Sequence, residues 1–302
     1  RLLFAPADIV AGIETNGSNM LDKKLGYYDP ETDSHAENTL IADQKMATQA
    51  GFLQSEWKMD KLVFSGGLRF DHYRIGDEVH SAEDIKGDVL SPRISLLYNF
   101  ANNLQFRAGF ARGFRAPQIF DEDLHIETSG SRKVLHRNAA DLKQESSNSF
   151  TASLDFSNFN GGWQYQFLVE GFYTQLIDPF ANEFGSPNEN EVVVYTRVNS
   201  EEGAKVAGLN LELNASPSKE LQFQSGFTFQ KSEFETPQEF AETRFFRTPD
   251  MYGYISLNYS PAPLFDIALT GNYTGPMLVP YFGPRLENPE EGRLNKSGSF
   301  FD

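Results

Sequence analysis

Apolar side chains fall on every second position along most of this chain, which is the period of a β-strand with one apolar and one polar face. Within 207–215, for example, Leu209, Leu211 and Leu213 alternate with Asn210 and Glu212. The same period recurs throughout the sequence. It predicts strands at about 45–57, 61–72, 90–99, 104–113, 147–156, 163–178, 191–215, 220–232, 250–260 and 264–274, with others near 1–14 and from about 298.

The connections between these strands alternate between short and long. The short ones are 58–60, 101–103, 158–162, 216–219 and 261–263, and the long polar ones are 15–44, 73–89, 114–146, 179–190, 233–249 and 275–297. An up-and-down antiparallel sheet places successive connections at opposite ends, so turns gather at one end and loops at the other. Bacterial outer-membrane barrels are built in this way. The pattern therefore predicts an all-β fold, an antiparallel up-and-down transmembrane β-barrel.

The segment 191–215 can be interpreted in two ways. Two strands joined at 199–204 would break the order of short and long connections, because the next connection, 216–219, is also short. One long strand with a bulge at Gly203 keeps that order, and glycine tolerates the positive φ that bulges often need. We therefore predict a single strand.

A soluble antiparallel sandwich would show the same alternation. The predicted strands, however, run to about 10–16 residues, against a usual 5–6 in soluble sheets and about 9–11 in a strand that crosses a bilayer obliquely. The 27 Phe and 12 Tyr of a chain with mean hydropathy -0.45 fit aromatic girdles at the membrane interfaces, as well as a Phe-rich sandwich core. No run of 18 apolar residues predicts a transmembrane helix.

Composition excludes several kinds of function. The absence of cysteine rules out zinc–thiolate sites and thiol catalysis. The net charge of -16 argues against a nucleic-acid partner, since phosphate binding draws on clustered Lys and Arg. No catalytic constellation and no glycine-rich phosphate loop can be assembled from the sequence. We expect neither an enzyme nor a bound cofactor.

We expect the barrel domain to continue beyond both ends of this chain. Arg1-Leu2-Leu3-Phe4 lacks the pattern of a signal peptide, and Phe300-Phe301-Asp302 resembles the opening of a strand. An open sheet would leave unpaired backbone groups in hydrocarbon, at a cost of several kcal/mol each. Residues 1–302 are therefore expected to form part of a barrel domain.

The run Gly113-Phe114-Arg115-Ala116-Pro117, preceded by Ser91-Pro92-Arg93-Ile94-Ser95-Leu96, resembles the barrel of TonB-dependent outer-membrane receptors. The extension Phe120-Asp121-Glu122-Asp123-Leu124-His125 resembles receptors of the Bacteroidetes group. Further segments also resemble sequences of this family, and they occur in the same order along the chain. They are Phe52-Leu53-Gln54-Ser55-Glu56-Trp57, Gly67-Leu68-Arg69-Phe70-Asp71, Asp141-Leu142-Lys143-Gln144-Glu145 and Gly208-Leu209-Asn210-Leu211-Glu212.

The resemblance implies a bacterial outer-membrane receptor with a 22-stranded barrel, of which this chain would supply about half. It also implies an N-terminal plug domain in the lumen, energy supplied through the TonB complex, and uptake of a ferric siderophore, haem, cobalamin or other bulky nutrient. The plug, the TonB-contacting segment and the last strands are expected to lie outside this chain. The fragment alone is therefore not expected to transport.

Two histidines lie where the resemblance implies that haem receptors hold an iron ligand. His125 and His136 fall between Arg115-Ala116-Pro117 and 138–142, although the second box here lacks the proline of the family pattern. A histidine in a long loop is also an ordinary solvated residue, and that alternative stays open.

Other loop residues are candidates for ligand contact. The Asp121-Glu122-Asp123 cluster offers carboxylates suited to calcium, or simply solvated charge. Arg112 and Arg115 are expected to point toward the lumen or its upper rim, where ion pairing with wall or plug carboxylates competes with ligand contact. The loop aromatics expected either to stack on a planar ligand or to pack on one another are Tyr27, Tyr28, Phe180, Phe184, Tyr281 and Phe282.

The sequence thus favours a receptor that imports a metal chelate or cobalamin. A passive channel or a barrel enzyme of the outer membrane would lack the ordered receptor motifs, or would need a Ser/His or Asp/His pair at the rim. A soluble β-rich adhesin or carbohydrate-binding module would fold without detergent.

Overall fold

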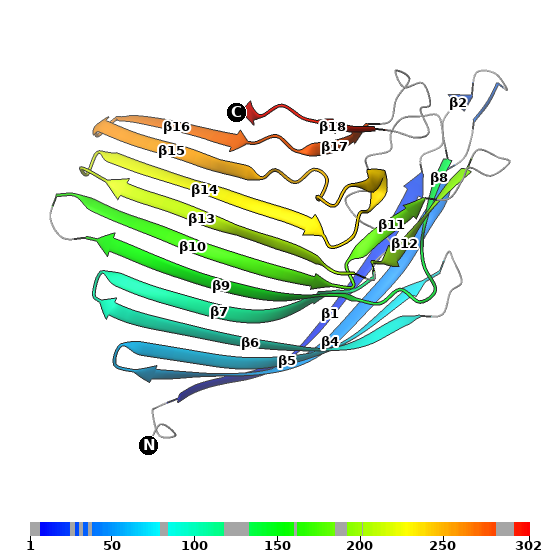
Figure 1. The fold of residues 1–302 in the computed structure, drawn as a ribbon, viewed down its shortest axis with the longest axis horizontal. Coiled ribbons are helices and arrows are strands. Elements are labelled where there is room, and N and C mark those ends of the chain that lie inside the picture. The colour runs from blue at the N-terminus through cyan, green and yellow to red at the C-terminus, as the bar shows by residue number, and fades with distance from the viewer. Residues whose placement is uncertain are drawn as a thin grey trace.

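The computed structural model describes residues 7–24, 28–29, 33–35, 38–78, 84–117, 133–159, 162–184, 192–200, 202–281 and 293–302, and shows one large curved antiparallel sheet (Figure 1). The sheet has twelve strands in the order β1-β4-β5-β6-β7-β9-β10-β13-β14-β15-β16-β19. These are β1 (Ala7–Lys24), β4 (Thr39–Met59), β5 (Leu62–Asp77), β6 (Ile85–Ala101), β7 (Leu104–Arg115), β9 (Glu145–Asn158), β10 (Gln164–Ile177), β13 (Ala204–Ser216), β14 (Leu221–Phe234), β15 (Met251–Ala262), β16 (Phe265–Thr274) and β19 (Phe300–Phe301).

The strands follow one another in chain order, so the predicted up-and-down antiparallel sheet is confirmed. Tight turns lie at one end and long connections at the other (left and right in Figure 1). The edges of the described sheet are β1 and β19. Several strands extend farther at the loop end than the sequence predicts. The connections predicted at 15–44 and 73–89 are shorter for this reason, because β1 continues to Lys24 and β5 continues to Asp77.

The prediction of one long strand over 191–215 is wrong. Residues Val192–Asn199 form β12, which leaves the large sheet, and the barrel strand β13 starts at Ala204. The order of short and long connections survives because β12 belongs to the long connection between β10 and β13. Gly203 is not a bulge: a Cβ there would meet the carbonyl oxygen of Leu176 at 2.8 Å, so glycine allows two backbones to approach closely.

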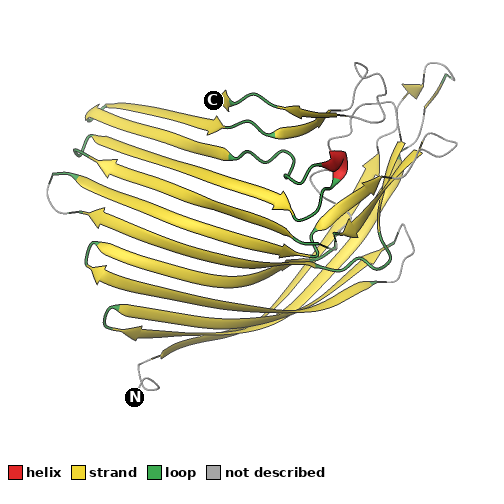
Figure 2. Ribbon diagram, viewed as in Figure 1, coloured by secondary structure: helices red, strands yellow, loops and turns green. Residues whose placement is uncertain are grey.

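The long connections carry small sheets of their own at the loop end. The larger of these joins two different loops, since β12 pairs antiparallel with β11 (Phe180–Phe184) and parallel with β8 (Lys133–Asn138). Two hairpins complete the set, β17 (Leu278–Tyr281) with β18 (Arg293–Lys296) and β2 (Tyr28–Asp29) with β3 (Ser34–His35). A short 3-10 turn, Glu239–Ala241, is the helical element in the described chain (Figure 2). Among the described residues, no helix is long and apolar enough to cross a membrane.

Alternation along each strand gives the large sheet one apolar and one polar face. Phe167, Leu209 and Leu269 share the apolar face and remain 41%, 39% and 65% exposed. Polar side chains on the other face form networks between strands. Arg69 of β5, for example, bonds Asp71 at 2.9 Å and reaches Glu14 of β1 at 2.8 Å. Leaving large side chains exposed in a continuous band is unfavourable in water but suits lipid contact.

Aromatic rings border the apolar face at both ends. At the turn end the ring centroids of Trp57–Phe64, Tyr98–Phe100 and Phe156–Tyr165 lie 5.5, 4.9 and 6.0 Å apart. Toward the loop end Phe110 contacts Phe150 at 4.9 Å, and Phe150 contacts Tyr173 at 6.5 Å. Tyr165 and Tyr173 lie on the same strand, and their separation along it is roughly 26 Å at a rise of about 3.3 Å per residue. This spacing matches two girdles around an apolar band of roughly 25 Å.

A buried hydrophobic cluster lies at the loop end. It is formed by Tyr73, Ile75, Val89 and Ala116, with Phe114 stacked on the ring of Tyr73 at 5.9 Å. The β6–β7 ladder ends at the pair Arg93–Ala111, so the last residues of β7 are free to pack on β5 and β6 instead. Ala116 and Pro117 of the Arg-Ala-Pro run are both buried, which gives that part of the motif a packing role.

Candidate functional site

A cluster of charged and aromatic side chains joins the loop sheet to the wall at the loop end. The guanidinium of Arg115, the last residue of β7, lies 4.8 Å from the ring centroid of Phe180, and the guanidinium of Arg197 lies 5.5 Å from the same ring. Glu145, the first residue of β9, approaches Arg115 to 3.5 Å. Its Oε2 also accepts a hydrogen bond from the backbone N–H of Phe180 at 3.0 Å. We call these four residues the mouth cluster.

Neighbouring backbone contacts hold the mouth cluster in place. The side-chain amide of Asn199 donates to the carbonyls of Asp178 at 2.8 Å and Lys143 at 3.1 Å, and its oxygen accepts from Lys143 N–H at 2.8 Å. Ala139 N–H donates to the carbonyl of Arg197 at 2.9 Å. Asn199 therefore ties together the connections that follow β7 and β10. Arg197 is only 9% exposed, so one cation of the mouth cluster is well shielded from water.

The mouth cluster places one carboxylate beside two guanidinium groups that share an aromatic ring. A guanidinium over a ring face is attracted by the ring quadrupole, by about 0.5–1 kcal/mol at exposed sites. The arrangement can hold the two loops in a fixed position, and it presents a cationic, aromatic surface at the entrance to the barrel.

A second loop is tightly organised around Glu242 and Arg244. The carboxylate of Glu242 accepts bonds from the Arg244 side chain at 3.0 Å and from the backbone N–H groups of Arg244 and Thr243 at 3.1 and 3.0 Å. The side-chain bond from Arg244 contributes most, followed by the backbone bonds, and together they lower the pKa of Glu242 to about 2. Phe240 and Ala241 adopt φ of 58° and 54°, a backbone strain that non-glycine residues tolerate only where the surroundings enforce it.

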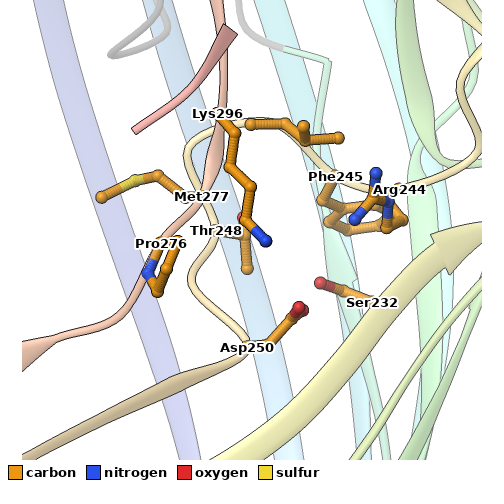
Figure 3. A pocket seen from close by; sticks show the side chains of 9 residues that line it. Ser232, Arg244, Phe245, Thr248, Asp250, Pro276, Met277 and Lys296 are labelled. Atoms are coloured by element: carbon orange, nitrogen blue, oxygen red, sulfur yellow. The ribbon is translucent and has the colours of Figure 1, made fainter. Parts of the chain in front are cut away.

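The hairpin β17–β18 docks on this second loop (Figure 3). Leu278 O accepts from Arg247 N–H at 2.7 Å, and Lys296 extends toward Thr248 and Asp250. The polar space that they enclose with Ser232 is about 20 Å³, which is room for a single water molecule. The contact between the hairpin and the second loop therefore holds the hairpin in place, and the space that it encloses is too small for a chelate.

The polar face of the sheet is hollowed just below the loops. A hollow of about 430 Å³ lies over β13 to β16, where Tyr252 and Tyr254 face Asn210 and Thr228. Asn210 accepts a hydrogen bond from Thr228 at 2.9 Å and donates to Glu170 of β10 at 3.0 Å. The wall is thus pre-arranged for polar partners in the lumen. Within the described residues, no group of three or more His, Asp or Glu side chains is placed to hold a metal ion.

Some of the site residues proposed from the sequence lie among the described residues, where they contact other side chains of this chain. Arg115 and Phe180 meet in the mouth cluster, where Phe180 is half-buried in β11 rather than exposed in an irregular loop. Tyr281 lies in β17 under the guanidinium of Arg293, 5.6 Å from its ring. Both rings pack within the chain, and their contact with ligand stays a prediction.

Several candidates lie partly or wholly outside what the structure describes. Only the backbone of His136 in β8, of Phe184 in β11 and of Tyr28 in β2 is described, and His136 pairs with Tyr195 of β12 in the ladder. The candidates outside the described residues are His125, Tyr27, Phe282, Asp121, Glu122 and Asp123.

The expectation for Arg112 is wrong. Arg112 and Arg115 are separated by an odd number of positions, so a regular strand sends their side chains to opposite faces. The ladder pairs Arg112 with Asn148, in the row next to the pair Phe110–Phe150 of the apolar face. Sequence reasoning missed Glu145, Arg197 and Asn199, because the first lay in a predicted loop and the others in the wrongly assigned strand.

Comparison with known proteins decides the family. The family model described as TonB dependent receptor-like, beta-barrel, matches residues 7–297. The chain belongs to the TonB-dependent receptor family. The predicted receptor barrel is thereby confirmed, and proteins of this family are outer-membrane transporters rather than enzymes. A search of curated proteins found no match.

Solved TonB-dependent receptors share the fold at low sequence identity. The FrpB iron transporter from Neisseria meningitidis (F3-3 variant) is 15% identical over 100% of this chain, with a TM-score of 0.67. The copper transporter OprC is 14% identical over 98% of this chain, with a TM-score of 0.68. FpvA of P. aeruginosa, in complex with a ferric pyoverdine, is 13% identical over 100% of this chain, with a TM-score of 0.68. The matches cover 45%, 45% and 39% of those proteins, so this chain spans less than half of each.

Proposed function

We propose that this chain forms part of the wall and mouth of a receptor that imports a metal chelate, with a ferric siderophore as the first candidate. Uptake would be energised by the TonB complex acting on a plug domain, both supplied by parts outside this chain. The polar wall around Tyr252 and Asn210 supports a plug-filled lumen, because its hydrogen-bonding groups suit a polar protein surface. The resemblance of 120–125 to Bacteroidetes receptors supports an origin in that group.

The mouth cluster carries the proposal. Ferric siderophores are bulky, often anionic and often aromatic, and a cationic surface with an aromatic ring suits such a ligand. Structures with the same fold support this ligand class, since they include an iron transporter, a ferripyoverdine receptor and a ferric-catecholate import receptor. They also include a copper transporter, so the proposed ligand class is metals and metal chelates in general and not iron alone. Cobalamin is a further candidate ligand for the same mode of uptake.

Haem is the second candidate, and one backbone observation favours it. The parallel ladder between β8 and β12 pairs His136 with Tyr195. Histidine and tyrosine are both residue types that ligate haem iron. If haem is the ligand, His136 is the first residue to test, followed by His125.

A spectroscopic titration of the full-length protein in detergent tests both candidates. The ligands are haem, cobalamin and a panel of ferric siderophores, and the variants are His136→Ala and His125→Ala. His72→Ala is the matched control, since His72 bonds Asp88 at 2.8 Å on the apolar face of the sheet. Saturable binding of one chelate supports the proposal, and loss of a haem signal in His136→Ala alone selects haem.

Failure to bind any of these ligands would overturn the metal-chelate proposal while leaving the family intact. A glycan or peptide nutrient, or a passive channel, would then be the better account. Calcium binding by Asp121, Glu122 and Asp123 is a separate proposal, which requires a calcium-dependent change that Asp121→Asn removes.

A further inference from the structure

Tyr73 of β5 belongs to the buried cluster at the loop end and lies on the polar face of the sheet. Its side chain is 1% exposed. Its ladder partner in β6 is Gly87, where a Cβ would come within 2.4 Å of both the ring and the hydroxyl oxygen of Tyr73. Because glycine leaves this space open, the tyrosine ring lies directly against the wall and has one defined position there.

Two contacts connect Tyr73 to the strands that follow β6. Its ring stacks on that of Phe114 in β7, with the centroids 5.9 Å apart and an angle of 23° between the ring planes. Its hydroxyl donates a hydrogen bond to Oε1 of Gln144 at 2.9 Å, and Gln144 directly precedes β9. One side chain of the wall therefore contacts both the end of β7 and the approach to β9.

The two residues that Tyr73 contacts are the sequence neighbours of the ion pair in the mouth cluster. Phe114 precedes Arg115, and Gln144 precedes Glu145. Arg115 and Glu145 form the last pair of the β7–β9 ladder, so the ladder orients them from one side only. Tyr73 supplies a contact beside each partner of that pair.

The segment before β9 is bound to two different parts of the molecule. The backbone of Lys143 bonds the side chain of Asn199, which belongs to the loop sheet, at 2.8 and 3.1 Å. The side chain of Gln144 bonds Tyr73, which belongs to the wall. A phenylalanine would fill the same space on Gly87, but it would leave Gln144 without this bond. The hydroxyl of Tyr73 therefore links Glu145 to the wall as well as to the loops.

We propose that Tyr73 is a positioning residue of the mouth cluster. Its ring holds the end of β7, its hydroxyl holds the start of β9, and together they set the pair Arg115–Glu145. Glu145 in turn keeps its bond to the Phe180 N–H, so the position of the loop sheet depends on a residue of the wall that does not contact it. The consequence for a chelate rests on the proposed function, whereas the positioning can be measured without any ligand, so the two can fail separately.

Hydrogen–deuterium exchange of the full-length protein with Tyr73→Phe tests the proposal. This variant keeps the ring and removes only the hydroxyl, so the protein is expected to fold. Amide exchange at 178–182 is expected to become roughly 2- to 12-fold faster, the range for loss of one ordinary hydrogen bond. Gln144→Leu, which removes the acceptor, is expected to have the same effect. The matched control is Tyr98→Phe at the turn end, where the ring contacts Phe100, and exchange at 178–182 should be unchanged.

Combination with Glu145→Ala separates positioning from a general loss of packing. If Tyr73 acts through Glu145, adding Tyr73→Phe to Glu145→Ala gives no further acceleration at 178–182. Equal acceleration in the presence and absence of Glu145 would overturn the proposal, because the hydroxyl would then act by another route. Unchanged exchange at 178–182 in a folded Tyr73→Phe protein would overturn it as well.

Discussion

Replacing Glu145 tests whether the mouth cluster holds the loop sheet to the wall. Glu145 is the one acid of the cluster, and it contacts two partners that belong to different segments. It pairs with Arg115 at 3.5 Å and accepts the Phe180 N–H at 3.0 Å. The variant Glu145→Ala leaves the N–H without this acceptor and removes the carboxylate that pairs with Arg115.

The expected cost can be worked from these contacts. A hydrogen bond to a charged group contributes about 1.5–3 kcal/mol. The ion pair adds little, at most about 1 kcal/mol, because the side chain of Arg115 is 53% exposed. We therefore expect about 2–3 kcal/mol less protection of the loop sheet, or roughly 30- to 150-fold faster amide exchange at 178–182 and 196–200. Amide exchange in the strands of the large sheet should be unchanged, because Glu145 lies at the very end of the β7–β9 ladder, where its backbone pairs with Arg115.

Hydrogen–deuterium exchange with mass spectrometry on the full-length protein measures this effect. Glu183→Ala is the matched control, because Glu183 is an exposed glutamate of the same loop sheet. Glu145→Gln keeps an acceptor without the charge and should give an intermediate rate. Unchanged exchange in Glu145→Ala, or equal acceleration in Glu183→Ala, would refute the role of the mouth cluster.

The remaining predictions concern the second loop, the apolar face, a close approach and the ligand. Because the pKa of Glu242 is lowered to about 2, its bonds with Arg244 stabilise the protein above the unfolded value of about 4.5 and are lost as pH falls toward 2. The Tm difference between native protein and Arg244→Met should therefore be constant from pH 7 to pH 5 and shrink below that; a constant difference down to pH 2.5 would count against the pairing. On the apolar face, Leu211→Arg should cost about 2–4 kcal/mol in urea unfolding from vesicles, whereas Gln224→Arg on the polar face should cost far less, and equal costs would reverse the assignment of faces. Gly87→Val should lower Tm, since any Cβ there would overlap the ring of Tyr73, while Gly51→Val, at a position with open space, is the control and should not. If haem is the ligand, His136→Ala should weaken its binding at least ten-fold, and an unaltered spectrum in that variant would exclude His136.

The barrel strands could be predicted because one pattern sets both local structure and environment. Alternation in 207–215 puts Leu209 and Leu211 on lipid and Asn210 on the lumen, whatever the neighbouring strands are. The short turns then make consecutive strands antiparallel neighbours in the sheet. Strand ends were harder to predict, because β1, β4 and β5 continue beyond the membrane band, where polar residues on both faces mask the period.

The loop end could not be predicted from the same pattern. The run Val192–Val194 has strong β-propensity in any sheet, but its partner β8 comes from a different loop that is distant in sequence. Within the same small sheet, the antiparallel ladder between β11 and β12 brings Arg197 to the ring of Phe180, because it pairs Phe180 with Asn199 and Asn182 with Arg197. Arg115 and Glu145 both lie in segments that resemble the receptor family, whereas Arg197 carries no local signal that distinguishes it from a solvated charge.

The most direct test of the account is uptake of a radiolabelled ferric siderophore by cells that carry the full-length protein. The ligand is the chelate that binds best in the titration, and the comparison is between cells with and without a functional TonB protein. For a TonB-dependent receptor we expect saturable accumulation that requires TonB and is reduced in Glu145→Ala. Accumulation that persists without TonB, or that rises linearly with concentration, would contradict it and indicate a passive channel.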